Sequence, residues 1–214
     1  NKPLKPNFIL MKTILLISTF LFSVLITNAQ WQKGTISYAN GNIKEGYIKA
    51  FGKTSQKNIE YKKTLNSRKE IIKSKDLLEI VYFVDGKQVI SRNLHYTKYD
   101  KKGKIAFTDK NANWFGVIYR GDFDILAVQV THGGTADYYF INWPGEKTAA
   151  EIFVKNAGMS IVVGGKKYLE RNIKPAFKGR CDKMIEDVEN EKFKPKDIRD
   201  VINYYEENCS RTEE

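Results

Sequence analysis

Apolar and polar residues alternate with a period of two along much of the chain between residues 31 and 143. The alternation is clear at residues 36–38, 47–51 and 58–62, and residues 79–84 (EIVYFV) are rich in β-branched and aromatic side chains. Successive side chains of a strand point to opposite faces, so this pattern predicts short strands with one buried face. No pattern before residue 143 is long enough for a crossover helix. An antiparallel β-barrel or β-sandwich is therefore predicted.

Turn residues separate these strands. Asn40-Gly41 and Asp85-Gly86 each lie between two alternating segments. Such pairs adopt the positive φ angles of tight hairpin turns, so a hairpin is predicted at each. Polar turns at residues 100–103 and 120–122 separate further short strands, which we place at residues 94–96, 105–107, 114–119, 123–130 and 138–143.

The period changes to that of a helix after Pro144. Ala149, Ile152 and Phe153 would share one face of a helix over residues 146–156. Another helix is predicted over residues 166–173, interrupted at Pro175. The segment between them, MSIVV at 159–163, is compatible with a strand or with a buried linker.

Two amphipathic helices end the chain, and each carries one cysteine on its apolar stripe. The stripes consist of Phe177, Cys181, Met184, Ile185 and Val188 in the first helix, and of Ile198, Val201, Ile202, Tyr205 and Cys209 in the second. Pro195 suits a first helical position. In an antiparallel helix hairpin Cys181 and Cys209 would meet, which predicts a disulfide. A metal site is the weaker alternative, because the two cysteines and two histidines show no ligand spacing.

The predicted fold class is α+β. A β-rich domain covers residues 30–143, and a helical segment at residues 144–214 packs on it. Residues 1–29 are left out of the fold. Residues 1–10 lack Met and precede Met11, so we expect them to lie upstream of the true start.

Residues 11–30 (MKTILLISTFLFSVLITNAQ) have the layout of a secretory signal peptide. Lys12 precedes an apolar run, and Thr27-Asn28-Ala29 then places small residues at the −3 and −1 positions of a cleavage site before Gln30. A membrane anchor is the alternative, but a spanning helix needs about 20 apolar residues and Lys12 shortens this run. We therefore expect export to the periplasm, the cell surface or the medium, and no integral membrane segment after cleavage.

The chain is basic, with a formal net charge of +11, or +8 once the three lysines of residues 1–29 are removed. Most of this charge is carried by Lys, whereas bidentate recognition of phosphates and bases favours Arg. Together with export, this argues against nucleic acid as a partner. It suggests attraction to an anionic envelope polymer or another envelope protein, and a solvated Lys-rich surface without a partner is the alternative.

No catalytic constellation is evident. The chain has no G-x-S-x-G elbow, and its two histidines, His95 and His132, stand alone. The glycine pair in residues 162–167 (VVGGKK) lacks the P-loop spacing, so we interpret it as a turn and predict no cofactor. Asp122 and Asp124 alternate on one strand, and a glycoside or phosphoester hydrolase using paired carboxylates is the alternative function.

Two sets of residues are candidates for binding. Trp114, Tyr119, Tyr139 and Trp143, with Tyr138, would form a platform for sugar rings or a protein, although such residues more often fill a core. Lys62 and Lys63 belong to a Lys-rich strip that either faces a polyanion or protects a sheet edge from pairing. The strip consists of Lys53, Lys57, Lys62, Lys63, Arg68, Lys69, Lys73 and Lys75.

Four segments resemble exported β-rich proteins of Bacteroidota-type bacteria. They are residues 27–30 (TNAQ), 34–48 (GTISY to GNIKEGYI), 114–126 (WFGVIYRGDFDIL) and 177–209 (FKGRC to ENC). The resemblance implies export and a helical C-terminus, and it transfers no functional residue. The function we predict is a non-enzymatic binding or structural module of the cell envelope.

Overall fold

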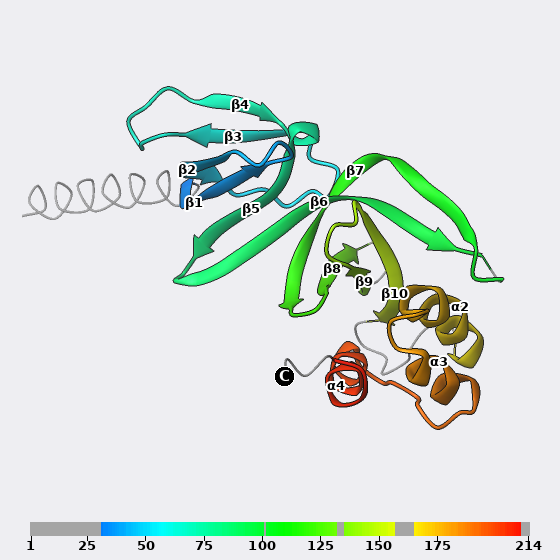
Figure 1. Cartoon of the computed structure of the whole chain (residues 1–214). Helices are drawn as coiled ribbons and strands as arrows, with labels where there is room; N and C mark the ends of the chain where they lie inside the picture. Colours follow the sequence, from blue (N-terminus) through cyan, green and yellow to red (C-terminus); the bar gives the residue numbers. More distant parts are fainter. Residues whose placement is uncertain (1–30, 101, 132–134, 157–164, 211–214) are drawn as a thin grey trace, which may run out of the picture.

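The structure is a computed structural model that describes residues 31–100, 102–131, 135–156 and 165–210. Ten strands form one mixed sheet, in the spatial order β10-β9-β8-β7-β6-β5-β1-β2-β3-β4 (Figure 1). The strands are β1 (Trp31–Tyr38), β2 (Ile43–Lys49), β3 (Asn58–Lys62), β4 (Glu70–Lys73), β5 (Leu77–Val84), β6 (Lys87–Tyr99), β7 (Ile105–Arg120), β8 (Asp124–Thr131), β9 (Thr135–Asn142) and β10 (Thr148–Asn156).

Both predicted tight hairpins are confirmed. Gly41 has a φ of +86° in the turn between β1 and β2, which pair antiparallel. Asp85 and Gly86 have φ angles of +49° and +75° between β5 and β6. Two consecutive positive φ angles are the signature of a type I′ turn, whose twist matches that of the flanking strands.

Strands β6 and β7 are longer than predicted, with 13 and 16 residues. Residues 105–107 and 114–119, predicted as separate strands, both belong to β7. The intervening residues 108–113 are polar except for Ala112, and none of them is buried, so they carry no alternation that would reveal a strand. The predicted turn at residues 100–103 is present: the Asp100 carboxylate accepts hydrogen bonds from the backbone N–H groups of Lys102 and Lys104.

The helix predicted over residues 146–156 is wrong, because β10 occupies this segment. It pairs antiparallel with β9 and, over three residues, parallel with β6. Ala149, Ala150, Ile152 and Phe153 are all buried. A strand covered on both faces loses the alternation of period two, and its apolar run then resembles one turn of a helix.

The predicted antiparallel barrel or sandwich is confirmed only as a β-rich sheet, because β10 also pairs with β6. This pairing joins β6 to β10 edge to edge through three residue pairs only, and it is parallel rather than antiparallel. The sheet is therefore mixed. The β-rich first part and the helical end of the predicted α+β fold are present.

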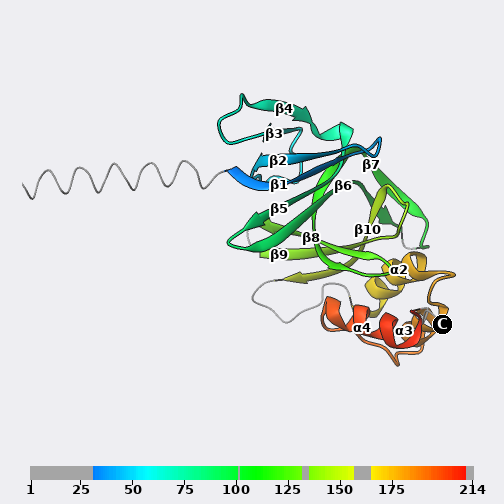
Figure 2. The ribbon, with the colours of Figure 1, turned by 60° about the vertical axis from the view of Figure 1, so that its left-hand side comes forward.

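Three helices, α2 (Gly165–Phe177), α3 (Asp182–Glu189) and α4 (Ile198–Asn208), follow the sheet and lie together at one end of the molecule (Figures 1 and 2). In the described part of the chain, no helix has the length and apolar character that crossing a membrane would require. The segment at residues 159–163 lies outside the described residues.

The predicted helix boundaries need three corrections. Helix α2 includes Pro175 and runs to Phe177, so Phe177 does not belong to the next helix. Gly179, in the break that follows α2, has a φ of +71°. A residue in this left-handed conformation commonly ends a helix. Helix α4 begins three residues after Pro195, where Asp197 and Asp200 form a capping box.

The predicted disulfide between Cys181 and Cys209 is confirmed, with the two Cα atoms 5.4 Å apart. Cys181 is the residue before α3, and Cys209 is the residue after α4. The bond therefore joins the start of one helix to the end of the next, as expected for the open end of a helix hairpin.

The core has three parts. One lies around β1–β5 and includes Trp114, and a second lies among β6–β10 around Phe115, Leu126 and Phe140. The largest joins strands β8–β10 to all three helices and includes Phe123. The helices are thus held on the sheet by shared apolar contacts, which places α2 beside the β6–β7 turn.

Candidate functional site

Of the aromatic residues predicted to form a platform, Tyr119, Tyr139 and Trp143 belong to the largest core cluster and Trp114 to another. Trp114 is buried and donates through Nε1 to Ser74 Oγ at 3.1 Å. Tyr139 packs its ring against Phe153 in the largest core cluster. The Tyr119 hydroxyl donates to Glu206 at 2.7 Å, and burial, followed by this hydrogen bond, raises the pKa of Tyr119 to about 12.

Tyr119 and Trp143 line the same hollow, of about 790 Å³, near the disulfide. Trp143 is buried and donates through Nε1 to the Ala176 carbonyl at 3.0 Å. The guanidinium group of Arg180 lies 4.1 Å from the centre of a Trp143 ring and forms an ion pair with Glu146 at 2.7 Å. Arg180 therefore occupies a face of the indole that a sugar ring would need.

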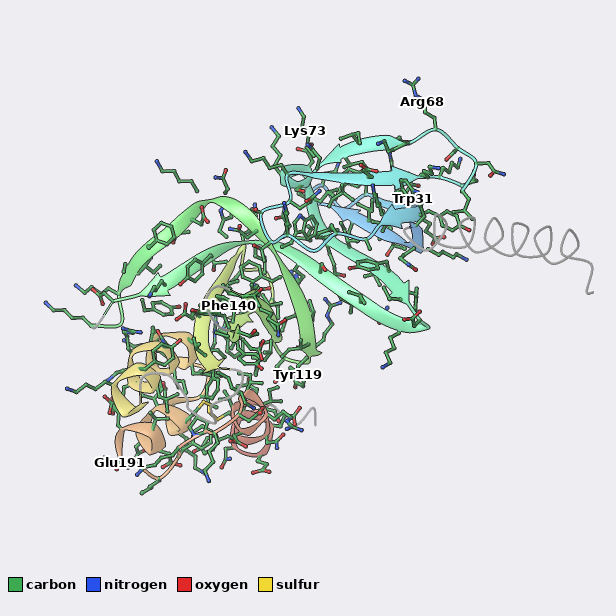
Figure 3. The ribbon with its side chains drawn as sticks, turned by 180° about the vertical axis from the view of Figure 1, so that it is seen from behind. Trp31, Arg68, Lys73, Tyr119, Phe140 and Glu191 are labelled. Atoms are coloured by element: carbon green, nitrogen blue, oxygen red, sulfur yellow. A yellow bond between two sulfur atoms is a disulfide. The ribbon has the colours of Figure 1, made fainter. Side chains whose placement is uncertain are left out.

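The Lys-rich strip lies over β3, β4 and their flanking loops. In Figure 3, Arg68 and Lys73 project into solvent at the end of the molecule away from Glu191 and the helices. Lys63 is exposed, whereas the Lys62 ammonium lies 4.8 Å from the Trp31 ring centre. The strip is a charged surface, and its member Lys53 lines a hollow of about 390 Å³ together with Phe51 and Trp114.

The carboxylates considered for hydrolysis differ in their surroundings. Asp124 is nearly buried between two guanidinium groups, 2.6 Å from Arg92 and 3.2 Å from Arg120. Arg120 also pairs with Glu79 at 2.6 Å. Asp122 lies outside this network and lines the hollow near the disulfide. Asp124 is thus engaged in an ion-pair network, and it lines a hollow of about 330 Å³ together with Glu79.

The remaining candidates from the sequence are the two histidines and the glycine-containing segment at residues 162–167. His95 Nδ1 lies 2.9 Å from the Asp109 carbonyl within the β6–β7 hairpin. His132 and residues 162–164 of the glycine-containing turn lie outside the described residues. In the ranges that the structure describes, no three His, Cys, Asp or Glu side chains are placed to hold a metal ion.

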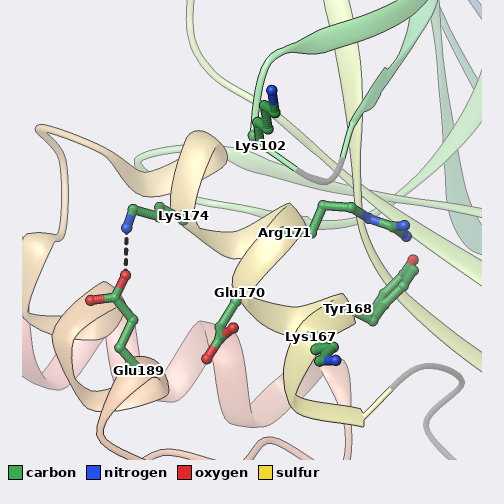
Figure 4. A pocket seen from close by; sticks show the side chains of 8 residues that line it. Lys102, Lys167, Tyr168, Glu170, Arg171, Lys174 and Glu189 are labelled. Atoms are coloured by element: carbon green, nitrogen blue, oxygen red, sulfur yellow. Dashed lines mark hydrogen bonds and ion pairs between the residues drawn. The ribbon is translucent and has the colours of Figure 1, made fainter.

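A basic hollow of about 660 Å³ lies beside α2 (Figure 4). Residues from the β6–β7 turn, α2 and α3 line it: Lys102, Gly103, Lys167, Tyr168, Glu170, Arg171, Lys174 and Glu189. Four cations face two carboxylates, so the lining carries two net positive charges. Lys174 and Glu189 form an ion pair. The other three cations, Lys102, Lys167 and Arg171, outnumber the remaining carboxylate, Glu170.

A buried carboxylate supports one wall of this hollow. Glu151 of β10 is 5% exposed and accepts hydrogen bonds from the hydroxyls of Tyr96 and Tyr168, both at 2.7 Å. Burial, and secondarily the negative charge of Glu151, raises the pKa of Tyr168 well above its usual range. The hydroxyl therefore remains a donor, and the ring is held in place.

Arg171 rests on this held ring. Its guanidinium carbon lies 5.0 Å from the centre of the Tyr168 ring. Within the described residues, the buried Arg171 Nε has no hydrogen-bond partner. Sequence analysis assigned no role to this helix, although Lys167, Arg171 and Lys174 recur at i, i+4 and i+7 and so predict a basic stripe.

Comparison of the chain with protein-family models, with curated proteins and with solved structures gives no match.

Proposed function

We propose that the protein is an exported, non-enzymatic binding module of the cell envelope that recognises an anionic polymer. The observation that carries this proposal is the basic hollow beside α2, where Lys102, Lys167 and Arg171 exceed the carboxylates around them. A concave site concentrates its field on a ligand better than a flat charged surface does. The Lys-rich strip at the other end of the molecule would add long-range attraction.

Export is part of this proposal. The apolar leader at residues 11–30 supports it, and so does the disulfide, since such bonds persist in oxidising compartments. Protein recovered from the cell envelope is expected to begin at Gln30. Recovery of uncut chain with reduced cysteines from the cytosol would contradict export.

The binding proposal is tested by retention of the mature protein, residues 30–214, on immobilised lipopolysaccharide and on acidic glycans. Three variants with the same change of charge separate the surfaces: Lys167→Glu in the hollow, Lys63→Glu in the strip and Lys110→Glu on β7, outside both. All three residues are exposed. We expect Lys167→Glu to weaken binding roughly tenfold or more, and Lys110→Glu to change it less than about twofold.

Retention should also fall as salt is added, because the attraction is electrostatic. Equal losses in all three variants would show that net charge alone is responsible and would contradict a shaped site. Retention no greater than that of an unrelated basic protein of matched charge would contradict the proposed function.

A further inference from the structure

The hollow beside α2 contains a donor whose capacity is unused. Arg171 lines the hollow, yet among the described residues its buried Nε–H meets no acceptor. A buried N–H without a partner costs free energy, so such groups usually have a partner supplied by water or by a ligand. The buried Nε is closed to a ligand in the hollow, so the Nη groups of Arg171 are the donors that a ligand there can reach.

The guanidinium group is also oriented before any ligand arrives. Its Tyr168 platform is fixed through Glu151, which in turn is held by Tyr96. A planar guanidinium in a fixed position presents two parallel N–H groups, a geometry that matches two oxygens of one phosphate or carboxylate. Lysine cannot reproduce that arrangement, because its ammonium is a point charge on a flexible stem.

The charge of the hollow distinguishes among oxyanions. Its lining carries two net positive charges, and Lys102 and Lys167 make no ion pair in the described part of the chain. A phosphate monoester carries between about −1.5 and −2 at pH 7, whereas a carboxylate or a sulfate ester carries one negative charge. The negative Glu151 lies behind Tyr168 and is compensated in part by two hydroxyl donors. A phosphate monoester therefore fits this charge best.

The size of the hollow indicates more than a free ion. Its volume of about 660 Å³ lies within the range of roughly 300–1,000 Å³ typical of small-molecule sites. A sugar-sized unit would contact the α2 and α3 walls while its charged group lies at Arg171.

We propose that this hollow binds a phosphate monoester carried on a sugar-sized unit, with Arg171 as the residue that determines specificity and Lys102 and Lys167 supplying the remaining charge. This inference rests on the proposed function, since it names the chemical group by which the polymer would be recognised.

Calorimetric titration of the mature protein, residues 30–214, tests the ligand class. The probes are glucose 6-phosphate, glucose 6-sulfate, glucuronate and inorganic phosphate. We expect glucose 6-phosphate to bind roughly tenfold more tightly than each of the other three. Its affinity should fall between pH 7.5 and 5.5, because the second pKa of a phosphate monoester is about 6 and protonation removes one charge. The affinities for sulfate and glucuronate should change little over this range.

Substitution of Arg171 tests the residue. Arg171→Lys keeps the charge and removes the planar fork, and Arg68→Lys makes the same change on the exposed strip. We expect Arg171→Lys to weaken glucose 6-phosphate binding roughly tenfold, with an unchanged unfolding temperature, and Arg68→Lys to leave it within about twofold. Equal affinity of wild type and Arg171→Lys, or equal affinity for glucuronate and glucose 6-phosphate, would overturn the inference.

The two proposals fail in different ways. Polymer retention that glucose 6-phosphate cannot compete with would overturn this inference and leave the binding function standing. Glucose 6-phosphate binding at Arg171 without polymer retention would support the site and contradict the proposed function.

Discussion

Replacing Phe123 by Ala is expected to lower the free energy of unfolding by about 3–5 kcal/mol, the usual cost of truncating a buried aromatic side chain. Phe123 is 1% exposed and lies at the junction between the sheet and the helices. Its ring centre is 4.9 Å from those of Trp143 and Tyr205, and 6.0 Å from that of Phe177. The cavity would thus open among residues of α2, α4 and the segment after β9.

Urea unfolding followed by far-UV and near-UV circular dichroism measures this change. Phe83→Ala is the matched control, because Phe83 lies on β5 of the same sheet and is 47% exposed. Its substitution should change stability by less than about 0.5–1 kcal/mol. A Phe123→Ala protein as stable as Phe83→Ala would contradict the shared core. So would helices that unfold in a separate step in the wild type.

Removing the disulfide is expected to cost about 3–4 kcal/mol, on the model in which a cross-link lowers the entropy of the unfolded chain. The bonded cysteines are 28 residues apart in sequence. The bond closes the loop that contains α3 and α4, and these helices are short, with 8 and 11 residues. Isolated helices of this length are marginal in water, so their stability depends on this closure and on packing.

The double variant Cys181→Ser with Cys209→Ser, compared with the wild type in urea, measures this cost. Adding a reductant to the wild type should reproduce the same loss, whereas the double variant should not respond to the reductant. A loss below about 1 kcal/mol, or a response of the double variant to the reductant, would contradict the assigned role of the bond.

The sequence predicted those features that depend on neighbouring residues. Asn40-Gly41 and Asp85-Gly86 specify their turns locally, and both hairpins are present. The disulfide could be predicted because each cysteine continues the spacing of the apolar stripe of the adjacent helix, although Cys181 precedes α3 and Cys209 follows α4. The same stripe analysis failed at Phe177, since Phe177 and Cys181 keep a helical spacing across a break that Gly179 makes.

The features that sequence analysis missed depend on contacts between distant segments. The sequence of β10 resembles that of a helix, because its own residues do not reveal that β9 and β6 flank it and that the helices cover it. Trp114 and Trp143 could be binding or core residues by composition, and only packing shows that both are buried. The basic hollow combines the β6–β7 turn, α2 and α3. No local pattern brings Lys102 to Arg171, although the basic stripe of α2 is visible in the sequence.

The most direct test of the central claim, that the hollow beside α2 is an anion-binding site, is a crystal structure of the mature protein, residues 30–214, with glucose 6-phosphate. The predicted result is a phosphate group within hydrogen-bond distance of the two Nη atoms of Arg171, with the sugar in the hollow. A phosphate bound instead at Lys63 or Arg68 on the strip, with the hollow empty, would contradict the account.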